Sequence, residues 1–317
     1  MDSGSVEYPR VSVVTLNWNS KDDTLECVAS LKKLNYPAYD IIVVDNGSAD
    51  GSVSALRASH PDITVIENGK NLGYGAGFDV GLAYAFAHGA EYCLILNNDT
   101  VIDPEALTEL LKMALQDERI GFVSGKVYWY GKPNTLQTTG RYNDPVMLIG
   151  PHVGTGEVDH GQYDQVRDYD FVDDVFLLVR RQVYEQVGGY DPLFFLYFEE
   201  TDWCARVRRA GFRIVYTPGA KIWHKGTVGK SDVPLNPQRV YYLQRYEVPF
   251  MRRNATPTQW HAYLRRVLFG LPRRILGYAK HGRFATMFAY LRGLGAGMSW
   301  VWHSWRSNPS AANGQST

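Results

Sequence analysis

The sequence predicts an α/β fold, in which a mixed sheet flanked by helices is followed by a basic, amphipathic helical extension. Short apolar runs alternate with amphipathic segments between residues 10 and 100, and alternation at this spacing is typical of parallel βαβ units. Three of these runs are followed directly by Asn and Asp residues. The last quarter of the chain carries the excess of basic residues.

Short apolar runs predict strands that are buried in a sheet. The expected strands are residues 11–16, 41–44, 63–67, 92–96, 121–130 and 212–216. The expected helices of the first half are residues 22–34, 52–60 and 75–88. Asp103 and Pro104 are expected to begin a fourth helix, with Asp as the cap and Pro at the first position. Residues 131–170 form a long polar stretch that suits a substrate surface, with disorder as the alternative.

Composition fits one large domain, or one domain with an appendage. The 317 residues are 45% hydrophobic, which is ample material for a core. The three cysteines are odd in number and widely spaced, which predicts reduced thiols in a cytosolic protein: Cys27, Cys93 and Cys204. We expect no secretory signal, because no basic segment followed by an apolar one opens the chain. No apolar run approaches the length of a membrane-spanning helix.

Polar residues at three strand ends predict a ligand crevice. The first strand is followed by Asn17, Trp18 and Asn19, the second by Asp45, and the fourth by residues 97–99. Because the carboxyl ends of parallel strands meet at one edge, these groups are expected to lie together where open α/β sheets bind ligands. Each end taken alone could be a simple polar turn.

Asp99 is the residue of this edge best suited to a metal. It is a hard oxygen ligand beside two amides, which suits a divalent cation that holds a diphosphate, and an Asx turn is the alternative. No GxGxxG follows the first strand, and no GxxxxGK[ST] occurs, which disfavours ordinary dinucleotide and P-loop sites. Residues 71–77 are glycine-rich, so their backbone can approach a ligand closely, although glycines also serve helix packing.

A second polar cluster contains Glu199, Glu200 and Asp202, directly after five apolar or aromatic residues. Carboxylates in such surroundings are costly to bury unless they are paired or used. They begin an expected helix that Gly211 ends, and capping of that helix is one interpretation. The other is a general base whose pKa the aromatic surroundings hold near neutrality. His224, further on, is either a metal or phosphate ligand or an ordinary core or surface residue.

The basic tail is distinct from the rest of the chain. Residues 241–317 hold eleven Arg or Lys and one acidic residue, Glu247, although the whole chain is neutral with 33 of each sign. Apolar and aromatic stripes with Arg at their margins suit an anionic membrane surface. The alternative is packing on the catalytic domain or on a second subunit, which would make a homo-oligomer. No recognition motif supports nucleic-acid binding. Pro272 is expected to break or restart a helix.

Taken in order, these segments resemble the inverting family 2 glycosyltransferases of GT-A fold, particularly the rhamnosyltransferase-like branch. The resemblance covers roughly residues 10–225, and each segment alone is weak whereas the ordered set is specific. The matching segments are VSVVTLNWNS (11–20), IVVDNGSADGS (42–52), NLGYGAGFDVG (71–81), LILNNDT (94–100), LVRRQVYEQVGGYDP (178–192), FFLYFEETDWCARVRR (194–209) and GFRIVYTPGAKIWHK (211–225).

The resemblance implies a nucleotide-diphosphate sugar donor in the crevice of the first half. Asp45 matches the position that contacts the base or ribose, and the other implied donor-binding residues are Thr15, Asn17, Asn19, Asn71, Gly73 and Asn98. Asp99 matches the metal-binding carboxylate, with Mg²⁺ or Mn²⁺ as the ion, and His224 matches a histidine that some relatives use near it.

The resemblance also implies the catalytic residues. Glu200 would be the base that deprotonates an acceptor hydroxyl, with Glu199 as the neighbouring candidate, and Asp202 would hold the acceptor or orient the helix start. Asp174 and Trp203 are further expected acceptor contacts. Three departures are evident: the metal motif has one carboxylate, Glu200 replaces the usual Asp, and an Asp pair at 173–174 replaces Thr-Gly or Ser-Gly.

The sequence thus predicts a metal-dependent sugar transferase. Residues 1–232 form the GT-A domain, with a donor half of about 10–125 and an acceptor half of about 126–232. Residues 233–306 form the basic helical region, and 307–317 a disordered tail. The expected reaction moves rhamnose from dTDP-rhamnose, or a UDP-sugar, onto a lipid-linked or polysaccharide acceptor at the cytoplasmic face of the membrane. The alternatives are another sugar such as galactofuranose, a soluble acceptor, or a catalytically silent glycan-binding protein.

Overall fold

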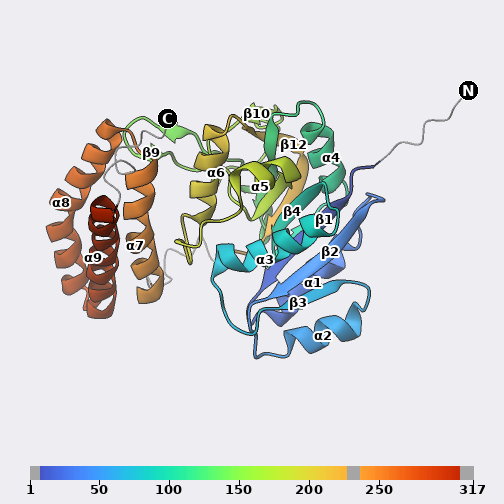
Figure 1. The fold of residues 1–317 in the computed structure, drawn as a ribbon, viewed down its shortest axis with the longest axis horizontal. Coiled ribbons are helices and arrows are strands. Elements are labelled where there is room, and N and C mark those ends of the chain that lie inside the picture. The colour runs from blue at the N-terminus through green and yellow to red at the C-terminus, as the bar shows by residue number, and fades with distance from the viewer. Residues whose placement is uncertain (1–7, 227–235, 308–317) are drawn as a thin grey trace, which may run out of the picture.

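The computed structural model describes residues 8–226 and 236–307 (Figure 1). In this part of the chain a ten-stranded sheet has the order β10-β12-β6-β11-β4-β1-β2-β3, with β5 paired to β12 and β7 to β6. The strands are β1 (Val11–Asn17), β2 (Tyr39–Asp45), β3 (Thr64–Glu67), β4 (Tyr92–Asn97), β5 (Thr100–Ile102), β6 (Ile120–Trp129), β7 (Lys132–Thr138), β8 (Asn143–Asp144), β9 (Leu148–Ile149), β10 (Arg167–Asp168), β11 (Phe176–Arg180) and β12 (Arg213–His224). The helices are α1 (Lys21–Leu31), α2 (Ser52–Ser59), α3 (Tyr74–Ala87), α4 (Ala106–Ala114), α5 (Arg181–Val187), α6 (Glu199–Arg209), α7 (Pro237–Asn254), α8 (Pro257–Lys280) and α9 (Phe284–Ser307).

The first half is the parallel sheet that its periodicity predicts. Strand β1 lies between β2 and β4 and runs parallel to both, and β3 extends the sheet beyond β2. The paired register places Asn17 opposite Asp45 and Leu16 opposite Asn97. The three polar strand ends therefore meet at one edge of the sheet.

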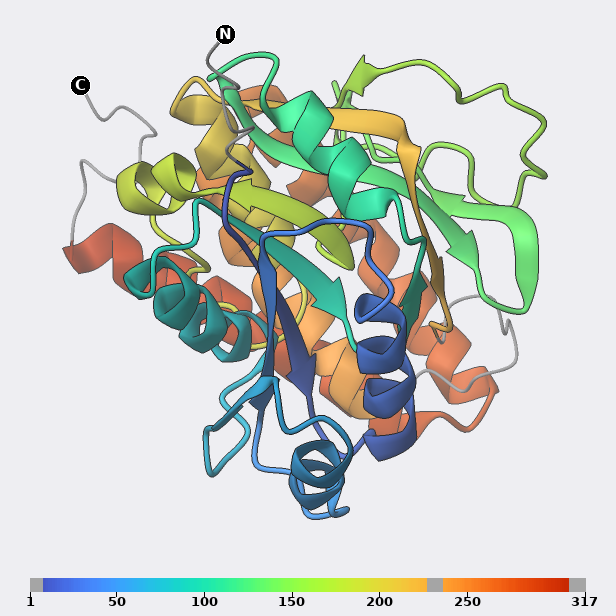
Figure 2. The ribbon, with the colours of Figure 1, turned by 90° about the vertical axis from the view of Figure 1, so that its right-hand side faces the viewer.

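Helices cover both faces of the sheet. One core cluster joins alternate strand residues to α1, α2 and α4, and the other joins them to α3, α6 and the C-terminal helices. Figure 2 shows α1 and α4 in front of the sheet and the orange C-terminal helices behind it. The buried runs of β1, β2 and β4 follow from this, because a strand covered on both faces is apolar throughout.

Strand β11 makes the sheet mixed. It lies antiparallel between β4 and β6, and β12 runs parallel to β6. The expected strand at 212–216 is the start of a longer strand, β12, which continues to His224.

The polar stretch 131–170 forms short strands rather than one structureless loop. Strand β7 pairs with β6, β8 pairs with β9, and β10 pairs with β12. A buried lysine anchors the stretch, because Lys126 Nζ lies 2.6 Å from Asp159 Oδ2 and 2.5 Å from Asp164 Oδ1. These tertiary contacts replace the periodicity that the stretch lacks.

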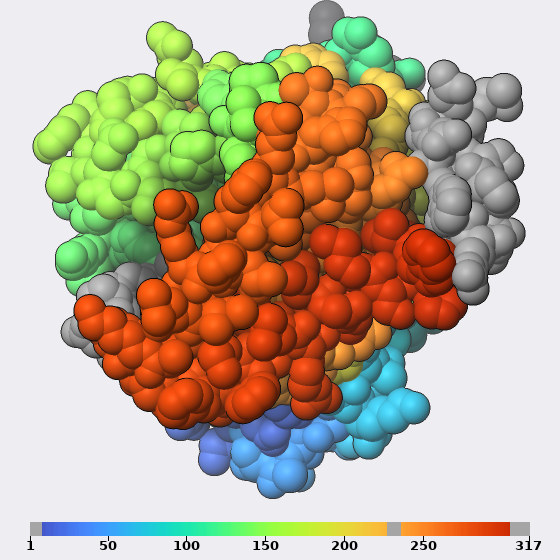
Figure 3. All heavy atoms as spheres, turned by 90° about the vertical axis from the view of Figure 1, so that its left-hand side faces the viewer, coloured from blue at the N-terminus to red at the C-terminus, as the bar shows by residue number. Residues whose placement is uncertain are grey.

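The C-terminal helices α7, α8 and α9 lie side by side and pack against the sheet and its flanking helices (Figures 1 and 3). Helix α7 covers the aromatic loop before α6: Phe195 stacks on Tyr242 at 5.2 Å between ring centroids, and Phe198 lies 5.3 Å from Phe250. Helix α9 approaches α7 closely at Gly293, where a Cβ atom would lie 2.4 Å from the Tyr241 carbonyl oxygen. The inner stripes of the tail therefore pack on the domain, as the alternative interpretation holds.

Several expected boundaries are corrected. Helix α8 runs through Pro272, which is exposed, so water can bond the Leu268 carbonyl that a proline leaves free. Helix α4 begins at Ala106, because Asp103 accepts the Glu105 amide in a preceding turn. Helix α9 reaches Ser307. The expected domain boundary near 232 and the rest of the expected tail, residues 308–317, lie outside the described residues.

No helix within the described ranges combines the length and apolarity needed to cross a bilayer.

Candidate active site

A network of hydrogen bonds joins the polar ends of β1, β2 and β4. The buried Asn17 donates to Asp45 Oδ1 at 2.7 Å, and its own Oδ1 accepts from Thr24 Oγ1 of α1 at 2.8 Å. Asn98, in the turn after β4, donates to the same Thr24 hydroxyl at 2.8 Å. Four segments that are distant in sequence are thus fixed in one rigid edge.

Asp45 also accepts hydrogen bonds from the loop that follows β2. Its Oδ2 accepts the amides of Gly47 at 3.1 Å and Ser48 at 2.8 Å, and only 2% of the residue is exposed. Asn19 contacts this loop, because its backbone N–H donates to Ser48 Oγ at 2.8 Å. Trp18 beside it is 55% exposed and is free to cover a flat ligand. Thr15, by contrast, is fully buried within β1.

The glycine-rich segment begins α3 and links the two halves of the site. Asn71 Oδ1 accepts the Gly73 amide at 2.8 Å, and Gly73 has a φ of +95°. The Tyr74 amide then donates to the Phe195 carbonyl at 2.8 Å. This segment therefore positions the loop that leads into the acidic start of α6.

Asp99 and His224 lie together at the end of β4 and β12. Asp99 Oδ1 is 3.1 Å from His224 Nε2, and Asp99 Oδ2 accepts the Gly226 amide at 3.2 Å. His224 Nδ1 lies 2.8 Å from Gln137 Oε1 of β7. Burial raises the pKa of Asp99, but the hydrogen bond and charge of His224 outweigh burial, so the pKa lies below its usual value.

The donor set of this pair fits a divalent cation. Gln137 Oε1 accepts the Nδ1 proton of His224, and the Nε2 atom faces Asp99. A cation bound here would take the place of a proton on Nε2, as in metal sites whose histidine is oriented by a second partner. Adjacent ligands of a small cation lie about 3 Å apart. Among the residues that the structure describes, no cluster of three or more His, Cys, Asp or Glu suits a metal. Asp99 and His224 are therefore the two candidate ligands that the described residues bring together here.

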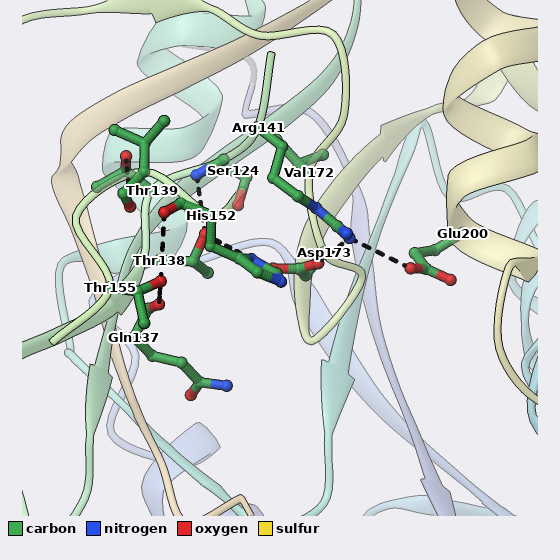
Figure 4. A network of polar contacts seen from close by, with 12 residues as sticks. Ser124, Gln137, Thr138, Thr139, Arg141, His152, Thr155, Val172, Asp173 and Glu200 are labelled. Atoms are coloured by element: carbon green, nitrogen blue, oxygen red, sulfur yellow. Dashed lines mark hydrogen bonds and ion pairs between the residues drawn. The ribbon is translucent and has the colours of Figure 1, made fainter. Parts of the chain in front are cut away.

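Arg141 organises the acids on the other side of the site (Figure 4). Its guanidinium lies 2.5 Å from Asp173 Oδ1 and 3.4 Å from Glu200 Oε1. His152 Nδ1 is 3.0 Å from Asp173 Oδ2. Despite the cost of burial, the charges of Arg141 and His152 lower the pKa of Asp173 well below its usual value. Asp173 is therefore an ionised partner that holds Arg141 beside Glu200.

The two glutamates at the start of α6 differ in environment. Glu199 is 4% exposed, and its Oε2 has no hydrogen-bond partner among the described residues. Burial and the nearby Glu200 charge raise its pKa well above the usual value. Glu200 has 18% of its side chain exposed and accepts the Thr201 hydroxyl at 2.9 Å. Glu200 is thus the more accessible carboxylate and the one with a cationic neighbour.

Two expected acceptor contacts lie in the interior instead. Trp203 has no exposed surface, and its indole donates to the Gly188 carbonyl at 2.8 Å. Asp202 is 1% exposed and is held by Arg206 Nε at 2.8 Å. Both side chains therefore pack on the inner face of α6 against the core. For Asp202 this placement fits the other expected role, in orienting the helix start, and an acceptor contact for either residue stays a prediction.

Sequence reasoning missed Arg141 and Gln137, which orient the proposed base and the proposed metal ligand. Both lie in the polar stretch 131–170, where no periodicity or motif distinguishes them. Tyr74 was also missed, although its place directly after the Asn71–Gly73 segment was a usable signal. Its hydroxyl lies 2.7 Å from Asn97 Oδ1 and 3.0 Å from Asp174 Oδ1.

Comparison with known proteins decides the family. Residues 12–188 match the model of the glycosyl transferase family 2, more than half of the chain. The chain belongs to this family. The polar strand ends of this glycosyltransferase, from Asn17 to Asp99, lie within the matched residues, whereas α6 and the C-terminal helices lie beyond them.

Relatives of this glycosyltransferase include rhamnosyltransferases. An N-acetylglucosaminyl-diphospho-decaprenol L-rhamnosyltransferase of Mycobacterium tuberculosis is 24% identical over 279 residues, which cover 81% of this chain and 89% of the relative. The dTDP-rhamnosyl transferase RfbF of Shigella flexneri is 24% identical over 243 residues, covering 73% of this chain and 76% of the relative. The enzyme is thus a rhamnosyltransferase-like glycosyltransferase.

Solved structures share the fold. The mannosyltransferase PcManGT from Pyrobaculum calidifontis, in complex with GDP-Man and Mn²⁺, aligns with a TM-score of 0.57 at 17% identity and covers 93% of this chain and 88% of its own. A structure of S. aureus TarS residues 1–349 aligns with a TM-score of 0.54 at 14% identity, covering 94% of this chain and 87% of that one. The expected GT-A fold is confirmed.

Proposed function

We propose that this glycosyltransferase moves rhamnose from dTDP-rhamnose, with inversion at the anomeric carbon, onto a hydroxyl of a lipid-linked glycan acceptor. The observation that carries the proposal is the placement of Glu200. It is an accessible carboxylate held by Arg141 on the acceptor side, while Asp99 and His224 form a cation-binding pair on the donor side. The names of the Mycobacterium and Shigella relatives supply the sugar and the lipid-linked acceptor.

Glu200 would act as the general base. It takes the proton of the acceptor hydroxyl while that oxygen bonds to the anomeric carbon, and the bond from this carbon to the nucleoside diphosphate breaks on the opposite side. Arg141 lies 3.4 Å from Glu200 Oε1 and would hold this carboxylate in place. Glu199 is buried and its pKa is raised, so it is less suited to this task.

The donor edge would hold the nucleotide. Asp45 and Asn19 would bound its base and ribose side, with Asn71, Gly73 and Asn98 beside them, while the fully buried Asn17 and Thr15 would support these residues from within β1. Asp99 and His224 would hold Mg²⁺ or Mn²⁺, which supplies positive charge against the leaving diphosphate. Because the described protein offers only two ligands there, we expect tight metal binding only with the diphosphate present.

Transfer and donor hydrolysis, measured with dTDP-rhamnose and either metal, test this function. Glu200→Gln should lower the turnover about 10² to 10⁴-fold, since general-base catalysis contributes about that much. Glu185→Gln on α5, whose side chain is 59% exposed, is the matched control and should leave turnover unchanged. Wild-type rates in both Glu200→Gln and Asp99→Ala would refute the catalytic assignment.

A binding readout separates the metal from catalysis. Nucleoside diphosphate with Mn²⁺ should raise the melting temperature of the wild type, because a ligand that binds only the folded state stabilises it. Asp99→Ala should lose the part of this shift that depends on Mn²⁺ and keep the part due to nucleotide alone. An unchanged metal-dependent shift in Asp99→Ala would place the metal elsewhere.

The outer face of α8 suits an anionic bilayer, where a lipid-linked acceptor resides. Leu268, Phe269 and Leu276 are 66%, 68% and 70% exposed on this face, and the exposed Arg265 and Arg273 lie among them at helical spacing. Figure 3 shows the C-terminal helices spread across this side of the molecule. Exposed apolar side chains with interleaved Arg are the pattern of helices that lie in a membrane interface.

Sedimentation with vesicles tests this surface. Arg265→Gln with Arg273→Gln should weaken binding to phosphatidylglycerol vesicles by roughly 30-fold, because each basic residue contributes about 1 kcal/mol. Leu268→Ser with Phe269→Ser should weaken it too, whereas Leu115→Ser, at a side chain 58% exposed after α4, should not. Equal sedimentation of all variants, or none of the wild type, would refute the membrane role.

A further inference from the structure

A chain of hydrogen bonds joins the acidic side of the site to the turn that carries Asp99. Tyr190 Oη lies 2.6 Å from Asp174 Oδ2, Tyr74 Oη lies 3.0 Å from Asp174 Oδ1, and the same Tyr74 oxygen lies 2.7 Å from Asn97 Oδ1. Asp174 is 6% exposed at the end of the loop before β11.

The protons of this chain can be counted. The Tyr74 hydroxyl has a single proton but lies within hydrogen-bond distance of two acceptor oxygens, one of Asn97 and one of Asp174. If Tyr74 donates to Asn97, its oxygen can bond Asp174 only by accepting a proton from that carboxyl group. Tyr190 donates to the other oxygen of Asp174. Every bond is therefore satisfied when Asp174 is a neutral carboxylic acid.

The acids around Asp174 also favour its neutral form. Glu199 and Glu200 approach from α6 and Asp173 from the same loop, all as acids. The nearest cation, Arg141, is bonded to Asp173 and Glu200 and makes no hydrogen bond to Asp174 among the described contacts. Burial, followed by the Glu200 charge, raises the pKa of Asp174 to about 8.

We propose that Asp174 is a positioning residue that stays protonated at neutral pH, holds Asn97 in place through Tyr74, and adds no charge beside Glu200 on the acceptor side. The first part rests on the geometry alone, and the link to Glu200 rests on the proposed function. Asp174 thus acts through other residues rather than as the acceptor contact that the sequence suggested.

The neighbouring Asp173 is a matched comparison for Asp174, because its pKa is shifted in the opposite direction. Asp173 is ionised and paired with Arg141 and His152. A neutral Asp174 instead accepts a hydrogen bond from Tyr190 and donates its own proton in a hydrogen bond to Tyr74. The amide of Asn reproduces the donor and acceptor of a neutral Asp174, because its Nδ2 can donate to Tyr74 and its Oδ1 can accept from Tyr190. An Asn side chain at position 173, by contrast, cannot reproduce the negative charge of Asp173.

Thermal unfolding from pH 4.5 to pH 8.5 tests the protonation of Asp174. An acid with a raised pKa in the folded state contributes stability below its unfolded pKa and loses it as pH rises toward the folded pKa. Asp174→Asn should therefore melt above the wild type by a margin that opens between about pH 4 and pH 8, reaching at least about 2 °C.

Asp173→Asn should behave in the opposite way. An acid with a lowered pKa contributes stability above its unfolded pKa, so Asp173→Asn should melt below the wild type at pH 7, with the gap closing toward low pH. The proposal is overturned if Asp174→Asn melts below the wild type at pH 7, if its margin does not change with pH, or if the variant does not fold.

The rate profile tests the positioning role separately. Wild-type transfer should fall as pH passes about 8, because an ionised Asp174 accepts the single Tyr74 proton and Asn97 loses its bond to Tyr74, and this fall should be absent in Asp174→Asn. An identical alkaline limb in both proteins would overturn the link to Asn97. Melting requires no turnover, so failure of the proposed reaction would leave the protonation result intact.

Discussion

Gly73 should be intolerant of the smallest side chain, because it joins the donor and acceptor halves of the site. Its backbone has φ +95° and ψ 177° at the start of α3. A Cβ atom there would lie 2.6 Å from the carbonyl oxygen and 2.7 Å from the ring of Phe195. Gly73→Ala therefore combines backbone strain with a collision against the loop that leads to the glutamates.

The magnitude follows from these two parts. A side chain in this region of φ and ψ costs about 1–3 kcal/mol, and forcing an extra carbon into a packed site costs about 1–3 kcal/mol more. Gly73→Ala should therefore lower the free energy of unfolding by about 2–6 kcal/mol. Gly51→Ala is the matched control: Gly51 has a φ of +80° before α2, but a Cβ atom there meets nothing within 4 Å. Strain alone should cost it about 1–2 kcal/mol.

Urea unfolding of both variants separates collision from strain. The midpoint of Gly73→Ala should lie below that of Gly51→Ala, with similar slopes because the surface exposed on unfolding is the same. Transfer activity of the folded Gly73→Ala enzyme should also fall, since the Tyr74–Phe195 backbone bond must shift. Equal midpoints for the two variants would show that the Phe195 contact does not constrain this segment.

Three further outcomes follow from buried groups. Asp202→Asn should cost about 3–5 kcal/mol in urea unfolding, because it leaves Arg206 beside a neutral partner, whereas Asp62→Asn, at an exposed ion pair, should change the unfolding midpoint far less. Lys126→Met should cost a similar 3–5 kcal/mol by isolating Asp159; a cost no larger than that of Lys112→Met would contradict the anchoring role. A thiol reagent should label the native protein slowly and the unfolded protein fully, because all three free cysteines are buried: Cys27, Cys93 and Cys204.

Most of the donor half could be predicted from local pattern. The parallel order of β1, β2 and β4 is confirmed, since short apolar runs between amphipathic segments carry their own signal. Gly211, with a φ of +89°, ends α6 as expected. The roles of the individual site residues stay predictions, although the structure brings Asp99 and His224 together across 125 residues of chain.

The acceptor half depended on contacts between distant segments. Arg141 and Glu200 are 59 residues apart, and nothing in the polar stretch around Arg141 marks it as their meeting point. The same holds for Gln137, which orients His224 over a separation of 87 residues. A long-range polar pair leaves no periodicity in a single sequence, so reasoning from spacing could not find either partner.

The sequence by itself determined the family, the α/β sheet, the polar strand ends and the uneven distribution of charge, because periodicity and residue type are local properties. Only the tertiary structure decided which acids face the site. Three of them start the same helix, yet Asp202 turns into the core, Glu199 is buried with its Oε2 unpaired among the described residues, and Glu200 remains the more accessible carboxylate beside Arg141. The physical reason is that successive residues of a helix point to different faces, and packing chooses which face meets the solvent.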